Sequence, residues 1–293
     1  MSTRRSFIKS AGLLTSGILL APKLFAHDKK YIGLQLYTVR DAMDKNASET
    51  LAKVSQSGYN SVEGTYSGDG KFHHVPAKEF LSLLKQNGLI MPSGHYRLGE
   101  EKVNGKIQEG TILSGWEKAV DIAAMIGIKY MVCGFLSVPE RGNLDHYKKV
   151  ADDLNLAGER CHKAGIQMCY HNHDFEFIKE DGKYPYDTLL SHTDKNLVKF
   201  EMDMYWVSKA GQDPVALINK HPGRFPLWHI KDMDNTSAHA FTEVGNGTIN
   251  FKRIFAQAKK AGLKYYFVEQ DKTPGDPFDS IKTSIAYIKH NLL

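Results

Sequence analysis

Short apolar runs alternate with amphipathic stretches from residue 31 to the end of the chain. The apolar runs are short and rich in β-branched and aromatic residues, so they predict buried strands. The stretches between them carry apolar residues at helical spacing, and several are followed at once by glycine, a common residue at helix ends. We predict strands at residues 31–37, 61–63, 89–95, 130–134, 166–171, 197–203, 226–231 and 265–269, and helices at 49–57, 78–86, 116–126, 147–163, 215–220, 251–260 and 277–289.

Eight strand–helix units in succession favour one closed parallel barrel, the (β/α)8 or TIM barrel, an α/β fold. A doubly wound sheet is the alternative, but no glycine-rich phosphate loop follows the first predicted strand. The longest irregular stretch, residues 95–115, follows the third strand, where a loop can cover a substrate or be a surface insertion. We predict a single barrel domain over residues 27–293.

The first 26 residues have the features of an export signal. Arg4 and Arg5 stand in a twin-arginine pattern, an apolar run spans residues 11–20, and Ala26 ends a processing site. The run is too short and too rich in Gly and Ser for a comfortable membrane span. We predict a twin-arginine signal peptide over residues 1–26, a periplasmic protein, and no membrane span after its removal. An uncleaved anchor or a disordered tail is the alternative.

Removal of this segment changes the charge of the chain. The sequence has 38 basic and 33 acidic residues, and the segment holds four of the basic and none of the acidic, which leaves 34 against 33, a net charge of +1. This balance gives no electrostatic reason to expect nucleic-acid or membrane binding. Cys133, Cys161 and Cys169 lack paired spacing, so they predict buried thiols and no disulfide framework.

Three predicted strands end in side chains that can bind a metal ion, Asp203, His229 and Glu269. The carboxyl ends of parallel strands converge on one rim of a barrel, so these distant residues can meet around one ion. An Asp at such a junction also fits a helix N-cap, and a His can be a core residue bonded to backbone. This ligand set, completed by water or substrate oxygens, suits one divalent ion, Mn²⁺, Co²⁺, Mg²⁺ or Zn²⁺.

Alternation along the strand at 226–231 places His229 and Lys231 on one face, and Trp228 and Ile230 on the other. The apolar face packs against helices, which leaves His229 and Lys231 inside the barrel. A buried ammonium needs an anionic partner or a substrate, so we predict that Lys231 is functional.

The segment MCYHNHDFEF at residues 168–177 offers three further ligands. His171 and His173 share one face of the strand, whereas Glu176 reaches that face only if the chain bends after the strand. A second carboxylate favours harder ions, and an imidazole favours Zn²⁺ or Co²⁺. We favour Glu176 as the fourth ligand, with His171 and His173 contacting the ion or its ligands.

The motifs YHNHDFEF, FEMDMYW, WHIKD, VGNGTINF and FVEQD follow one another in this order, after GLQLYTVRD at residues 33–41. Together they resemble the sugar phosphate isomerase/epimerase family of xylose isomerase-like TIM barrels, which is related to the endonuclease IV fold. The resemblance covers nearly all of residues 27–293 and is specific for the superfamily, not for a substrate. It implies that Asp203, His229 and Glu269 hold a divalent ion. The first ligand of the family is commonly a Glu at the end of the fifth strand, where this chain has His171.

The resemblance also implies an isomerase or epimerase that acts on a sugar or keto-sugar through a metal-stabilised enediolate. Glu176 or Glu269 would abstract the proton, and Lys231 or His95 would stabilise the enediolate or return a proton. Because sugar phosphates are chiefly intracellular, the predicted export favours an unphosphorylated carbohydrate. The residues expected to bind the substrate are Gln35, Tyr37, Glu63, His171, His173 and Trp206.

Two other functions fit the same residues. A lyase or hydratase (dehydratase) of a keto-sugar or inosose begins with the same enediolate and differs in whether a hydroxyl leaves or water adds. A catalytically silent sugar-binding protein would keep the barrel and its rim, although Lys231 and the three strand-end ligands argue against it. DNA repair is not expected, because the chain lacks net basic charge. A homo-oligomer is compatible with all three functions.

Overall fold

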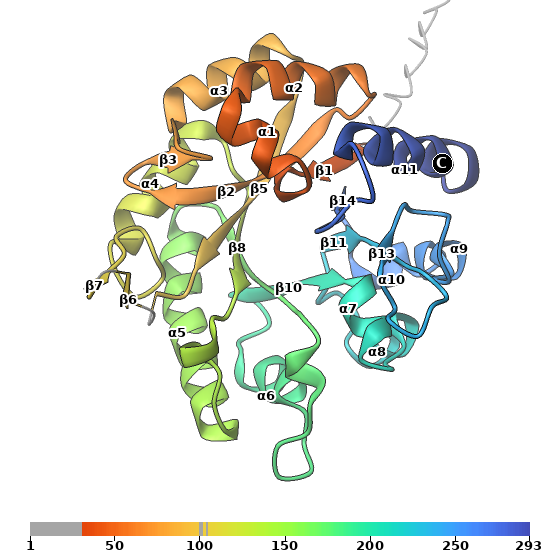
Figure 1. Ribbon diagram of the computed structural model, residues 1–293. Coiled ribbons are helices and arrows are strands. Elements are labelled where there is room, and N and C mark those ends of the chain that lie inside the picture. The colour runs from red at the N-terminus through yellow and green to blue at the C-terminus, as the bar shows by residue number, and fades with distance from the viewer. Residues whose placement is uncertain (1–30, 100–101, 104) are drawn as a thin grey trace, which may run out of the picture. The chain divides into compact units, whose positions relative to one another are not determined.

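A closed barrel of eight parallel strands forms the centre of the protein. The computed structural model describes residues 31–99, 102–103 and 105–293, so the predicted signal peptide lies outside the described residues. The strands follow the order β1, β2, β5, β8, β9, β10, β11 and β14, and β14 pairs with β1 to close the ring (Figure 1). They are β1 (Gly33–Gln35), β2 (Ser61–Gly68), β5 (Ile90–Arg97), β8 (Tyr130–Phe135), β9 (Gln167–His171), β10 (Val198–Asp203), β11 (Leu227–Ile230) and β14 (Tyr265–Val268).

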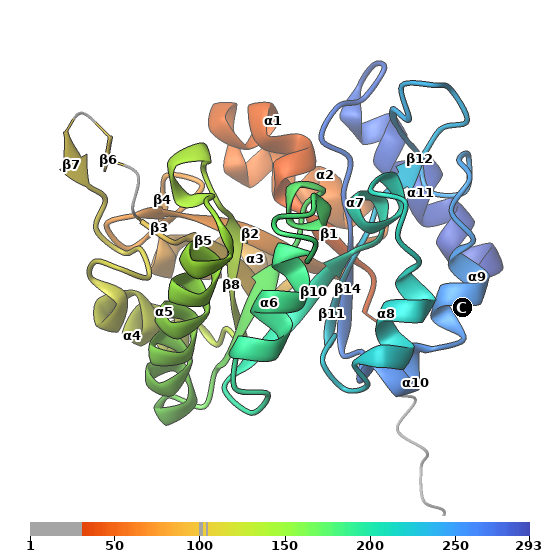
Figure 2. The same cartoon turned by 90° about the horizontal axis from the view of Figure 1, so that it is seen from below.

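The (β/α)8 barrel predicted from the sequence is therefore confirmed, and each predicted strand overlaps one of these eight. Helices lie outside the ring of strands (Figures 1 and 2), and consecutive helices from α2 to α6 also contact one another. The helices are α1 (Arg40–Lys45), α2 (Ala47–Gln56), α3 (Ala77–Gln86), α4 (Trp116–Ile126), α5 (Leu144–Lys163), α6 (Pro185–His192), α7 (Met204–Lys209), α8 (Pro214–Lys220), α9 (Phe251–Phe255), α10 (Ala258–Ala261) and α11 (Pro277–Asn291). Among the described residues, no helix is both long and apolar enough to cross a membrane.

Some predicted elements differ from the observed ones. Helices α1, α6 and α7, which have six to eight residues, were not predicted. The helix predicted at 251–260 is interrupted between α9 and α10. The stretch predicted to be irregular, residues 95–115, begins within β5 and contains a small hairpin of β6 (Lys102–Val103) and β7 (Lys106–Ile107). Two other small additions are β3 (Lys71–Phe72) with β4 (Val75–Pro76), and β12 (Asp232–Met233) with β13 (Phe241–Thr242).

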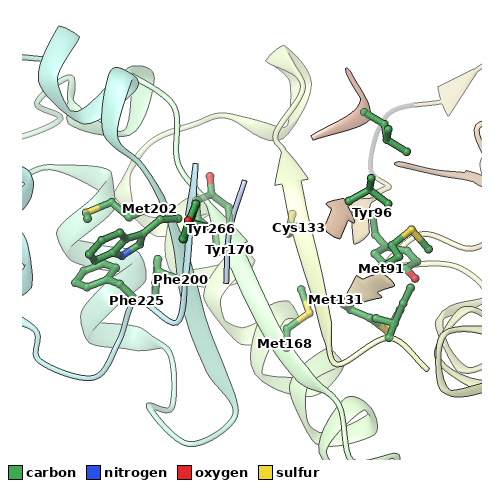
Figure 3. Close-up of a cluster of buried hydrophobic side chains, with 14 of the residues drawn as sticks. Met91, Tyr96, Met131, Cys133, Met168, Tyr170, Phe200, Met202, Phe225 and Tyr266 are labelled. Carbon is green, nitrogen blue, oxygen red and sulfur yellow. The ribbon is translucent and has the colours of Figure 1, made fainter. Parts of the chain in front are cut away.

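Two apolar layers hold the barrel together. The outer one lies between strands and helices, and Figure 3 shows part of it, including Met131, Met168 and Phe200. Cys161 of α5 packs against Met131, with 3.9 Å between the two sulfur atoms. The second layer is a smaller, separate cluster on β8, β9, β11 and β14, and its members are Val132, Cys169, Leu227 and Phe267. All three cysteines are buried and free, as predicted.

Asp232 organises the loop that leads from β13 to α9. Its buried carboxylate accepts hydrogen bonds from the backbone N–H groups of Met233, Gly245, Gly247 and Ile249, at 2.8 to 3.2 Å. A Cβ atom at Gly247 would lie 2.3 Å from Asp232 Oδ1, so this close approach requires glycine. The glycine-rich segment at residues 245–247 therefore binds the carboxylate of Asp232 through its backbone N–H groups.

Replacement of Asp232 tests this interpretation. In an Asp232→Ala variant, four backbone donors lose their acceptor, and we expect the free energy of unfolding to fall by about 3 kcal/mol or more. Chemical denaturation measures this loss. Asp279→Ala, which removes a carboxylate that is 77% exposed, should change stability by less than about 0.5 kcal/mol. A loss below about 1 kcal/mol for Asp232→Ala would contradict the organising role.

Candidate metal centre and active site

The inner face of the barrel changes from apolar to charged towards the carboxyl ends of the strands. On β11 the inward positions run from Leu227 through His229 to Lys231, and on β9 they run from Cys169 to His171. Residues two apart on a strand share one face, so Cys169, Leu227 and Phe267 of the inner cluster are followed on that face by His171, His229 and Glu269. The side chains predicted from the strand ends are thus brought together in one buried layer.

Asp203, His229 and Glu269 form one group of metal-capable side chains. Their ligand atoms all lie within 4.8 Å of one another, and His229 Nδ1 is 3.0 Å from Glu269 Oε2 and 3.9 Å from Asp203 Oδ2. Asp203 also caps α7, because its Oδ1 accepts hydrogen bonds from the N–H groups of Tyr205 and Trp206. The roles of helix cap and metal ligand are therefore compatible for Asp203, because the cap uses Oδ1 and leaves Oδ2 for an ion.

A second group of metal-capable side chains consists of His95, His171, Glu201 and His229. One oxygen of Glu201, Oε2, lies 2.8 Å from His95 Nε2, 3.0 Å from His171 Nδ1 and 3.2 Å from His229 Nε2. Sequence analysis missed Glu201. The signal was present, because Glu201 is two residues before Asp203 on one strand and so shares its inward face.

His171 and His229 connect the two groups. Each imidazole turns one nitrogen to Glu201 and the other towards Asp203, whose Oδ2 is 3.7 Å from His171 Nε2. A metal-binding histidine usually donates its other N–H to a carboxylate, which fixes the ring and its tautomer. The arrangement is therefore suited to two imidazoles that ligate an ion beside Asp203 and are oriented from behind by Glu201.

Glu63 supports the same layer from β2. It accepts hydrogen bonds from Gln35 Nε2 (2.8 Å) and Ser93 Oγ, and its Oε2 lies 2.7 Å from His229 Nε2 and 3.1 Å from His95 Nε2. Burial opposes its charge, but the two histidines outweigh burial and lower its pKa. Gln35 and Glu63, both predicted to bind the substrate, are fully buried behind the histidines and are not among the residues that line the cavity described below.

Lys231 lies between three carboxylates. Its Nζ is 2.6 Å from Glu269 Oε2, 2.7 Å from Asp271 Oδ2 and 3.1 Å from Asp203 Oδ2. Burial favours the neutral amine, but these carboxylates outweigh it and hold the pKa of Lys231 well above its usual value. Its cation also lies 5.5 Å from the centre of the Trp206 ring. The predicted inward lysine thus has its anionic partners.

Glu176 lies outside both metal-capable groups. Its oxygens accept hydrogen bonds from Tyr170 Oη (2.6 Å) and from the backbone N–H of His173 (2.9 Å). The chain does bend after β9, through the short turn Phe175–Phe177, but the bend carries Glu176 to Tyr170, which is on the outer face of the strand. The placement does not support the prediction that Glu176 is a ligand or a base.

Burial and neighbouring charges separate the protonation states of the other groups. Burial opposes the charged form of His95, but Glu63 and Glu201 outweigh it and raise the pKa to about 10. Burial lowers the pKa of His173 to about 3. Burial also opposes the charge of Glu269, yet Lys231 outweighs it and holds the pKa of Glu269 well below its usual value.

A cavity of about 520 Å³ opens onto this layer. Two of its lining groups, His173 Nδ1 and Trp206 Nε1, are buried atoms with no hydrogen-bond partner among the described residues, so both are available to a ligand. The predicted site residues that line the cavity are Tyr37, His95, His171, His173, Trp206, Lys231 and Glu269.

Comparisons with known proteins bear on the family and the fold. A family model described as "Xylose isomerase-like TIM barrel" matches residues 51–290. An inosose dehydratase from Clostridium beijerinckii is 26% identical over 166 residues, which are 50% of this chain and 55% of that protein. The chain spans about half the length of the curated relatives it matches.

Solved structures resemble nearly the whole chain. A sugar phosphate isomerase/epimerase from Parabacteroides distasonis is 30% identical, with a TM-score of 0.77 over 92% of this chain and 96% of that one. The IolI protein with a zinc atom has a TM-score of 0.67 over 89% of this chain and 97% of its own, at 14% identity. The second likeness is one of fold alone.

The pKa of Glu176 gives a test of its placement. Burial raises this pKa from 4.5 to about 7. The folded protein therefore holds the proton more tightly, so the stabilisation is present below pH 4.5 and is lost as the pH rises through 7. In metal-free protein, the unfolding free energy should fall between pH 5 and pH 8 by about 3 kcal/mol more than in Glu176→Gln.

Two controls complete this test. Glu180→Gln, at an exposed position nearby, should keep the pH dependence of the unchanged protein. Metal content after loading, measured by elemental analysis, should be the same in Glu176→Gln as in the unchanged protein. Loss of the ion from Glu176→Gln would show that Glu176 is a ligand after all.

Proposed function

Because this chain belongs to the xylose isomerase-like TIM barrel family, we propose that it is a divalent-metal-dependent isomerase or epimerase of a sugar or keto-sugar. One observation carries the proposal. Glu269 and Lys231 form a buried acid–ammonium pair, 2.6 Å apart, that lines a cavity beside Asp203 and His229. A base next to a fixed positive charge is what proton abstraction beside a carbonyl requires.

The residues present fit a divalent ion. Asp203 Oδ2 is buried and has no hydrogen-bond partner among the described residues, although the Lys231 ammonium lies 3.1 Å away as an ion pair. We propose that Asp203, His229 and Glu269 hold the ion and that His171, not Glu176, is the fourth ligand. The mixture of carboxylate and imidazole suits Zn²⁺, Co²⁺ or Mn²⁺. When bound, the ion would polarise a substrate carbonyl and acidify the neighbouring C–H.

Residues of the chain would move the proton. Glu269 is held ionised, so it is the base that takes the proton from carbon. Lys231 keeps its charge and stabilises the negative charge that develops on the substrate oxygen. His95 is held protonated at neutral pH and is the acid that can return a proton. The free nitrogens of His173 and Trp206 would orient substrate hydroxyls.

A lyase or dehydratase of a keto-sugar or inosose is the second proposal. Two observations favour it. The curated relatives are inosose dehydratases, and a histidine stands where the family commonly has a carboxylate on the fifth strand. Glu269 is the one glutamate among the described residues that line the cavity, and it is paired there with several groups that can protonate a leaving hydroxyl. Abstraction of the same proton begins both reactions.

Isotope exchange tests the shared first step. The metal-loaded protein is incubated in deuterated water with a panel of sugars, 3-keto sugars and inosose. We expect deuterium at the carbon beside the carbonyl, without mass loss for an isomerase or epimerase, and with loss of water for a dehydratase. A chelator should abolish the exchange and Mn²⁺ or Co²⁺ should restore it. No exchange on any compound, with no bound metal, would favour a silent sugar-binding protein.

Lys231→Met tests the role of the ammonium. We expect exchange to fall at least a hundredfold, because the charge that stabilises the developing oxyanion is removed. Circular dichroism and metal content establish that the variant is folded and loaded. Lys282→Met removes a lysine that is 60% exposed and should leave the rate unchanged. Normal exchange by folded, metal-loaded Lys231→Met would remove Lys231 from the mechanism.

Export is the third part of the proposal. The twin-arginine pattern supports a periplasmic enzyme and hence an unphosphorylated carbohydrate substrate. Cell fractionation should find a protein in the periplasm that begins after Ala26. Replacement of Arg4 and Arg5 by Lys should retain the full-length precursor in the cytoplasm. Equal export of the Lys variant would contradict this route.

A further inference from the structure

An aromatic wall extends from the proposed metal centre to the mouth of the cavity. It consists of Trp206, His173, Phe175 and Phe135, all of which line the cavity. Ring centres are 5.5 Å apart between Trp206 and His173, and 5.1 Å apart between His173 and Phe135. Phe175 stacks on His173 at 5.6 Å and meets Phe135 edge-on at 6.2 Å. The rings therefore form one continuous surface.

The two ends of the aromatic wall differ. Trp206 follows the Asp203 strand end, and its ring is 5.5 Å from the ammonium of Lys231. Phe135 is at the end of β8 and is 43% exposed, although most large apolar side chains of this barrel are buried. One sugar ring held at Lys231 can cover Trp206, but Phe135 remains open to a further group.

Polar groups accompany the outer part of the wall. The guanidinium of Arg141 lies 3.6 Å from the centre of the Phe175 ring and 5.0 Å from that of Phe135, and its Nε donates to the carbonyl of Leu136. This packing fixes the orientation of the guanidinium. Arg141 and Asp174 both line the cavity, so hydrogen-bond donors and an acceptor lie beside apolar ring faces. Aromatic faces flanked by polar groups suit a second sugar ring, which has C–H faces and hydroxyl edges.

The size of the cavity also agrees with a ligand that has two sugar rings. Its volume of about 520 Å³ lies within the range, about 300–1,000 Å³, of sites that enclose drug-sized ligands, and a single monosaccharide is smaller than such ligands. We propose that the substrate is a glycoside, one ring of which reacts at Lys231 and Glu269 while the second ring packs on Phe135, beside Arg141 and Asp174. This inference rests on the proposed function and specifies the substrate class of the same site.

Binding measurements test the second-ring site. Calorimetric titration of the metal-loaded protein compares glucose with cellobiose and maltose, and xylose with xylobiose. We expect at least one disaccharide to bind roughly tenfold or more tightly than its monosaccharide, because one well-placed aromatic contact supplies about this factor. In Phe135→Ala, the preference for the disaccharide should fall to near one. Phe135→Trp should retain it.

The same titrations include a control variant and can give results that contradict the second-ring site. Leu156→Ala removes a side chain on α5 that is 64% exposed and lies outside the cavity lining, and it should keep the disaccharide preference. Equal affinity for every pair, or a preference that survives in Phe135→Ala, overturns the second-ring site. Phenyl glucoside bound more tightly than cellobiose, with the difference lost in Phe135→Ala, would assign the wall to an aryl group instead.

The isotope-exchange assay separates this inference from the proposed function. If the protein exchanges deuterium into monosaccharides and shows no disaccharide preference, the proposed function holds and the second-ring site does not. If disaccharides bind through Phe135 but no compound exchanges, the aromatic wall binds carbohydrate and the proposed reaction is wrong.

Discussion

Several carboxylates inside the barrel are buried away from bulk water. The rest of the site depends on the groups that neutralise their charge. Glu63, Glu201, Asp203 and Glu269 are all buried. A buried charge is strongly unfavourable unless it is paired and hydrogen-bonded. Lys231 and the histidines supply that pairing, and the apolar cluster below them closes the barrel to solvent. The same surroundings separate the protonation states that acid–base chemistry requires.

Sequence reasoning succeeded where a regular strand sets the direction of a side chain. The alternation along β11 assigned His229 and Lys231 to the barrel interior, and the convergence of strand ends brought Asp203 and Glu269 beside them. The order of strands and helices was enough to predict the closed barrel, because eight parallel strands with one crossover helix each have few other solutions.

The same reasoning gives no side-chain direction beyond the strand ends. Glu176 follows β9 across a bend, and the direction of a side chain after a bend depends on its local partner, here Tyr170 on the outer face. Glu201 was not predicted, although it stands two residues before Asp203 on the same strand and therefore shares its face. The wall around Phe135 and Phe175 joins two strand ends through side-chain packing, and no periodicity in the sequence reports such contacts.

The position of Lys231 among three acids also affects how an ion is taken up. Lys231 is a counter-cation for the same carboxylates that would hold the proposed divalent ion. Uptake is then an exchange in which the incoming ion competes with the ammonium of Lys231 and with protons on His229. If the proposed ion binds, protons would leave the protein as it enters, and the heat of loading would then depend on the ionisation enthalpy of the buffer.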